Sequence, residues 1–162
     1  QRDRMANSKP PETPEYAVYP TALTAPWEDR RRAVGEAMFS AIGIPREDKA
    51  KRMQWFARNF QFFDAPVALF VSLDRQMGLP QWADAGALLN SIMLLLVEAG
   101  LDSCPQECWA MYPQLLGGVL GLPENRILWT GMSIGYRDPD HPANAAWQSA
   151  RAPSDEWLTM HG

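Results

Sequence analysis

Apolar residues recur at helical spacing in two neighbouring stretches of the sequence, residues 26–43 and 45–60. A proline opens each stretch, in the position where a helix tolerates one. The first stretch also carries Glu28 and Asp29 near its start, where the positive end of the helix dipole favours acidic side chains. The pattern predicts a pair of helices joined by a short turn.

Two further stretches, residues 65–74 and 125–136, are apolar on both faces and rich in β-branched or aromatic side chains. Such stretches are typical of strands covered by helices on both sides. Between them, the apolar residues 85–99 predict a helix. This stretch is shorter than the ~20 residues that span a bilayer, so we expect the helix to be buried within the protein. Residues 112–123 predict a short helix closed by Gly121 and a following proline.

The two ends of the sequence are rich in proline. Residues 1–26 contain five prolines, so spaced that they exclude a continuous helix or a central strand, and we expect an extended arm. Residues 137–162 keep Trp147 and Trp157 among polar residues and prolines, which predicts an arm packed on another surface. The order of helices, strand, helices, strand and tail predicts an α+β fold.

Composition narrows the class of protein. A chain of 162 residues with 46% hydrophobic content can build one core of its own. The net charge of −4, without a long basic block, does not favour a nucleic-acid partner. Two cysteines are too few for a disulfide scaffold, and the sequence has no secretion signal and no membrane-spanning stretch. These features predict a cytoplasmic protein that does not associate with membranes.

The stretch "LDSCPQECWAMYP" places Cys104 and Cys108 four residues apart. A closed zinc site needs two further ligands, and His141 and His161 lack the usual paired spacing. A thioredoxin-type dithiol has two intervening residues, whereas this stretch has three. The simplest interpretation is a loop cysteine and a helix cysteine that pack as small apolar groups. The signatures of serine hydrolases, phosphate-binding loops and HExxH metalloproteases are absent from the sequence.

Four segments together resemble the nitroreductase family of FMN-dependent NAD(P)H oxidoreductases. They are "RNFQFFDAPVALFVSLDR", "WADAGALLNSIMLLLVEAGLDSCPQECWAMYP", "LGLPENRILWTGMSIGYRDPDHPAN" and "SARAPSDEW". The resemblance runs from about Tyr19 to the C-terminus, with the segments in the family's order. It implies a nitroreductase-like α/β sandwich, a central sheet flanked by helices, truncated at the N-terminus by roughly the first third of a typical member.

The same resemblance implies an FMN site. The residues after the long central helix form a loop against the flavin ring in this family, which assigns Cys104, Pro105, Gln106 and Glu107 to that loop. A basic residue of the C-terminal arm contacts the FMN phosphate, and Arg151 holds that position. An arginine suits a phosphate because its guanidinium donates two parallel hydrogen bonds. Spacing alone equally allows Arg151 to be a solvated charge.

The resemblance also divides the chain into four parts within one partial domain. Residues 1–26 form the extended arm, residues 27–63 a helical lid, residues 64–136 the core and residues 137–162 an arm that embraces a second protomer. Trp27, Phe39 and Phe63 are candidates for lining the substrate space, although helical spacing favours core packing for each of them. A homodimer is implied, and two-fold dimers are also the commonest oligomers.

Transfer of a hydride from NAD(P)H through FMN to a nitroaromatic, quinone or related acceptor is the implied function. The flavin carries the redox chemistry, so no protein side chain is assigned as catalytic. The main alternative is a truncated, non-catalytic domain that acts as a dimeric binding or structural module. A specialised flavin reaction, such as reductive dehalogenation or flavin breakdown, is a third interpretation that lid residues would decide.

Overall fold

A computed structural model describes residues 12–145 and 148–161. The predictions for residues 1–11 and for Trp147 therefore lie outside the described residues. The chain divides into two compact units. The larger one comprises residues 1–21 and 53–137, and the smaller one residues 22–52 and 138–162. Each unit is described by itself.

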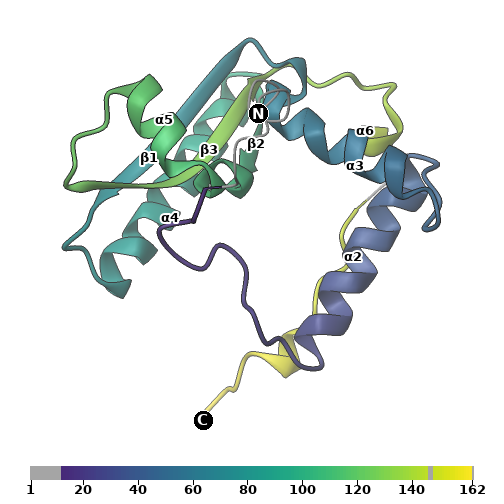
Figure 1. Ribbon diagram of the computed structural model, residues 1–162. Coiled ribbons are helices and arrows are strands. Elements are labelled where there is room, and N and C mark those ends of the chain that lie inside the picture. The colour runs from purple at the N-terminus through teal and green to yellow at the C-terminus, as the bar shows by residue number, and fades with distance from the viewer. Residues whose placement is uncertain (1–11, 146–147, 162) are drawn as a thin grey trace. The chain divides into compact units, whose positions relative to one another are not determined.

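The larger unit is built on a three-stranded antiparallel sheet with the order β1-β3-β2 (Figure 1). The strands are β1 (Val67–Asp74), β2 (Asp102–Gln106) and β3 (Arg126–Gly135). β3 lies in the centre and is the most buried strand, because it pairs on both sides. The mixture of helices and sheet confirms the predicted α+β class.

Strands β1 and β3 confirm the two predicted strands, but β1 is less buried than expected. Leu73 is its one buried residue, and Val67 is 53% exposed. β1 lies at an edge of the sheet, which leaves its first residues open to solvent. The prediction of a strand covered on both faces was wrong for this part of β1.

Four helices were predicted and are present. They are α2 (Trp27–Ala41), α3 (Lys49–Ala57), α4 (Leu79–Glu98) and α5 (Pro113–Leu120). α5 ends at Gly121, whose φ of +63° is the left-handed conformation that glycine adopts without strain. α4 begins six residues before the predicted start, because the Gln81 side chain accepts the Gly78 N–H and Pro80 fits the first turn.

The prediction that the central helix is buried was wrong for the described residues. Leu89 is the buried side chain of α4. Five of its large apolar residues are more than half exposed: Leu79, Leu88, Leu94, Leu95 and Val97. Exposure of several large apolar residues on one helix is typical of an interaction surface.

The core of the larger unit is an aromatic cluster around Trp109 in the 3-10 helix η2 (Glu107–Met111). The indole stacks on Phe62 at 4.6 Å between ring centroids and meets Phe60 and Phe70 edge-on at 5.3 and 5.6 Å. A Cβ at Gly131 would lie only 2.5 Å from Trp109 Cδ1. Glycine is therefore required in the middle of β3 for the indole to pack against the sheet.

Residues 12–21 contain no helix or strand, as expected, but they are anchored to the larger unit. The Glu12 carboxylate accepts the N–H groups of Gln114 and Leu115 and so caps the start of α5. Glu15 forms an ion pair with Arg75. The Tyr16 hydroxyl donates to the Trp129 carbonyl oxygen at 2.5 Å.

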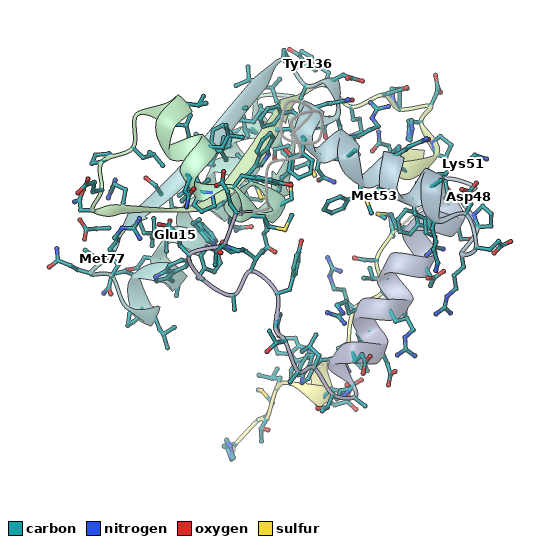
Figure 2. All side chains as sticks on the ribbon, viewed as in Figure 1. Glu15, Asp48, Lys51, Met53, Met77 and Tyr136 are labelled. Carbon is teal, nitrogen blue, oxygen red and sulfur yellow. The ribbon has the colours of Figure 1, made fainter. Side chains whose placement is uncertain are left out.

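In the smaller unit, the C-terminal segment runs along α2 (Figure 1). Arg30 of α2 pairs with Glu156 in the 3-10 helix η3 (Ser154–Glu156). The turn between α2 and α3 is held by Arg52, which donates two hydrogen bonds to Glu36 at 2.8 and 2.7 Å. Figure 2 shows Asp48 beside Lys51 at the start of α3, where its carboxylate accepts the Lys51 N–H at 3.0 Å.

Gly131→Ala should destabilise the protein by about 1–3 kcal/mol, because the new methyl group would displace the Trp109 indole. Gly118→Ala is the matched control, since no atom lies within 4 Å of a Cβ at that position of α5. This control should stabilise by about 0.5–1 kcal/mol through helix propensity. Urea unfolding followed by tryptophan fluorescence measures both, and equal effects would contradict the assigned packing.

The raised pKa of Tyr16 predicts that the protein loses stability in alkali. Burial, followed by the nearby Glu107 charge, raises the pKa of Tyr16 from its ordinary value of 10.0 to about 12. The folded state thus keeps a proton that the unfolded chain has lost, so the free energy of unfolding falls between about pH 10 and pH 12. The loss should be about 1 kcal/mol, since solvent screens the half-exposed ring. In urea unfolding at pH 9 and pH 11.5, Tyr16→Phe should lose less stability than the wild type; the loss that remains comes from Cys108 and Tyr19, whose pKa values are also raised.

Candidate functional site

The four residues assigned to a flavin-facing loop lie on a strand and the helix that follows it. Cys104, Pro105 and Gln106 belong to β2, and Glu107 begins η2. The prediction of a loop was therefore wrong for the first three. Pro105 suggests a turn in the sequence, but an edge strand accommodates a proline because its free side needs no N–H donor.

β2 presents one open edge. One side pairs with β3, with Cys104 opposite Ser133 and Gln106 opposite Gly131, and β2 is the last strand in the order of the described sheet. The side chains of Cys104, Pro105 and Glu107 are exposed, whereas Gln106 is only 2% exposed. The segment thus offers accessible side chains and unpaired backbone groups on the outside, with one amide side chain buried behind them.

The buried Gln106 side chain connects β2 to the segment after α3. Its Nε2 donates to the Asn59 carbonyl oxygen at 2.9 Å. Its Oε1 is buried without a hydrogen-bond partner among the described residues, which costs about 1–3 kcal/mol relative to hydration. A buried and half-satisfied amide of this kind points to a role beyond simple packing.

We call residues 59–64 the aromatic turn; they lie within the 3-10 helix η1 (Arg58–Asp64). Phe62, Phe63 and Asp64 adopt φ values of +52°, +51° and +65°, a region that residues other than glycine seldom occupy. An ion pair of 2.5 Å between Arg58 and Asp64 closes the turn. Neither glycine nor asparagine occupies the left-handed positions, so the sequence carried no turn signal there.

Phe63, a predicted substrate-lining residue, is half-buried in this turn. Its ring packs against Trp55 at 5.5 Å between centroids, and the Arg58 guanidinium lies 5.9 Å from the ring centroid. The left-handed backbone therefore holds Phe63 on the side of the turn occupied by Trp55, while its neighbour Phe62 stacks on Trp109.

The remaining predicted residues belong to the smaller unit. Trp27 is 59% exposed, with the Arg30 guanidinium 5.1 Å from its ring centroid. Phe39 is half-buried under the Arg52 guanidinium at 4.3 Å, which agrees with the packing alternative for this residue. Arg151 is exposed and donates to the Ser149 hydroxyl. The larger unit thus brings Cys104–Glu107 and the aromatic turn together through the Gln106 contact.

The two cysteines differ in environment. Cys108 is 3% exposed, and burial raises the pKa of its thiol to about 12, with Cys104 contributing next. Cys104 is exposed, which contradicts the expectation that both cysteines pack as apolar groups. Among the described residues, no three of the His, Cys, Asp and Glu side chains gather as a metal site would require.

A comparison with protein families matches residues 16–136 to the Nitroreductase family. The chain belongs to this family. The match covers the whole sheet, α4 and the segment around Trp109, so it includes the strand edge described above.

Curated relatives and a solved structure agree with this assignment. Nitrobenzene nitroreductase of Ectopseudomonas oleovorans is 37% identical over 81% of this chain and 58% of its own length. Chloronitrobenzene nitroreductase of Comamonas testosteroni is 34% identical over 91% of this chain and 64% of its own length. The chain thus spans about three-fifths of these relatives.

The FMN and NADPH-dependent nitroreductase NfnB from sphigopyxis sp. strain HMH is 47% identical to this chain. Its crystal structure superposes with a TM-score of 0.93 over 99% of this chain and 72% of its own. The agreement confirms the predicted nitroreductase-like fold. In the described part of the chain, no helix has the length and apolar character needed to cross a membrane.

Thiol labelling tests the environment of the cysteines. At pH 8 the Cys108 thiol should stay protonated and buried, because its pKa is raised to about 12. Iodoacetamide should therefore modify Cys104 alone in the folded protein and both residues in urea. Mass spectrometry of Cys104→Ser, which should remain unlabelled until it unfolds, is the control. Rapid labelling of Cys108 in folded protein would contradict the assigned burial.

Proposed function

We propose that this protein is an FMN-dependent oxidoreductase that transfers a hydride from NADPH to nitroaromatic compounds. The observation that supports it most is the 47% identity, over nearly the whole chain, to a nitroreductase named as FMN- and NADPH-dependent. Two curated relatives are named for nitrobenzene and chloronitrobenzene, and these names favour small nitroarenes as acceptors.

The residues on the open edge of β2 fit a flavin ring. The flavin has a flat apolar face and a polar edge, and β2 offers an exposed apolar proline beside unpaired backbone donors and acceptors. Cys104 and Pro105 carry small side chains, which let a ring approach the strand closely. When bound, FMN would supply the redox chemistry of the reaction.

The protein's own residues bind and orient in this proposal. The backbone of residues 104–107 would contact the flavin edge, and the exposed Arg151 guanidinium would bind the phosphate. Phe63 and Trp27 would supply apolar surface to the acceptor, whereas Phe39 would pack under the Arg52 guanidinium. No titratable side chain needs to move a proton for these roles, since binding and exclusion of water suffice.

We also propose a cytoplasmic homodimer. The exposed apolar residues of α4, Leu88, Leu94, Leu95 and Val97, form a surface of the kind that a second protomer covers. A two-fold interface along a helix would bury the same residues from both copies. The homodimer also agrees with the resemblance, since sites in this family lie at a dimer interface.

The function is tested by titrating the purified protein with FMN and following flavin fluorescence, with molecular mass measured by size-exclusion light scattering. Saturable binding by a dimer, followed by NADPH oxidation on addition of nitrobenzene, would support the proposal. Flavin that never binds, even at millimolar concentration, would contradict it and favour the non-catalytic binding module.

Arg151→Ala tests the phosphate contact. Loss of one charge-assisted hydrogen bond of about 1.5–3 kcal/mol should raise the Kd for FMN about 10- to 100-fold. Riboflavin, which lacks the phosphate, should bind both proteins equally. Arg31→Ala is the matched control, because Arg31 is an exposed arginine of the same unit. An unchanged Kd for FMN in Arg151→Ala would refute the assignment.

A further inference from the structure

The Gln106 side chain does not lie on the open edge of β2. It is 2% exposed, whereas the side chains on either side of it, Pro105 and Glu107, are exposed. A ligand on the accessible side of the strand would therefore meet the backbone here and not the amide group. The Gln106 side chain itself contacts Asn59, which leaves the backbone of this strand to meet a ligand, as the resemblance implies.

Gln106 is part of a closed ring of contacts. Its Nε2 donates to the carbonyl oxygen of Asn59 at 2.9 Å, at the start of the aromatic turn. Within the turn, Phe62 stacks on Trp109 at 4.6 Å between ring centroids. Trp109 lies against Gly131, where an added Cβ would come within 2.5 Å, and Gly131 is the strand partner of Gln106. Each contact in the ring constrains the next.

The amide is the polar link in this ring. The pairing of β2 with β3 is also hydrogen-bonded and fixes the register of the strand. The remaining contacts are aromatic packing, which tolerates small sliding movements, whereas the Gln106 hydrogen bond fixes direction as well as distance. Gln106 Oε1 has no hydrogen-bond partner among the described residues. The hydrogen bonds of this side chain are therefore those that Nε2 donates to Asn59. Gln106 is the last residue of β2, directly before Glu107, so the bond lies where the strand ends.

We propose that Gln106 is a positioning residue that couples the aromatic turn to the backbone of residues 104–107. Resting on the proposed function, this means that the acceptor side of the site, at Phe63, and the flavin side, at β2, are joined through one hydrogen bond. A change in the turn moves the end of β2, and a group bound along β2 alters the turn. Three successive left-handed residues make the turn sensitive to loss of this bond, because their strained backbone needs outside support.

Gln106→Met tests the coupling without any flavin. Methionine keeps the unbranched length of the side chain and removes the donor, so packing is largely retained. Amide hydrogen exchange, measured by mass spectrometry, should rise together in peptides covering residues 59–64 and 104–111. Ser91→Ala is the control: the Ser91 hydroxyl donates to the Ala87 carbonyl oxygen at 2.9 Å within α4, so this variant also removes one side-chain hydrogen bond, at residues outside the ring. In the control, exchange in the two peptides should stay at the wild-type rate.

Flavin measurements give the second readout. Gln106→Met should raise the Kd for FMN about 5- to 10-fold and shift the visible absorbance band of bound FMN. The KM for nitrobenzene should also rise several-fold, while saturating FMN restores most of kcat. Ser91→Ala should show neither the shift nor the change in KM.

The outcomes separate this proposal from the proposed function. If exchange rises in only one of the two segments, or in neither, the coupling is refuted whether or not the protein binds FMN. If both segments respond but wild-type protein binds no FMN, the coupling stands and the proposed function fails. Should Gln106→Met fail to fold, Gln106→Leu replaces it with the same expected results. A folded Gln106→Leu variant with wild-type exchange would refute the coupling.

Discussion

The contact between the Trp109 indole and Gly131 is the constraint on which the larger unit depends. A side chain at position 131 would occupy the place of the indole, so glycine in the central strand admits the largest ring of the core. Phe60, Phe62 and Phe70 then pack around that ring, which is 9% exposed. The aromatic turn is held against the sheet by this packing, because its left-handed backbone has no glycine to relieve the strain.

The second feature of the unit is the division of β2 into a buried and an accessible side. Pairing with β3 satisfies the backbone on one side, and the open edge leaves donors and acceptors for another group on the other. Helix α4 also has an accessible surface, because several of its large apolar side chains are exposed to solvent in the described chain. Both surfaces are of the kind that a partner or cofactor completes.

Prediction from the sequence succeeded where the signal was local. The helices that follow Pro26 and Pro45, and the stop at Gly121, depend on capping and backbone preferences of neighbouring residues. It failed at β2, where Pro105 suggested a turn and only pairing with β3 makes a strand. The resemblance assigned residues 104–107 to the cofactor. It could not show that the Gln106 side chain lies on the buried side of the strand.

By itself, the sequence determined the family, the α+β class, most helices and the short list of residues from which a flavin site would be built. These properties follow from local periodicity and from motifs in a fixed order. Tertiary structure alone decided the left-handed conformation of Phe62–Asp64, the requirement for glycine at position 131 and the bond from Gln106 to Asn59. Each of these features is a contact between residues far apart in the chain or is imposed by such a contact. A local sequence pattern cannot encode them, because it does not contain the position of a distant side chain.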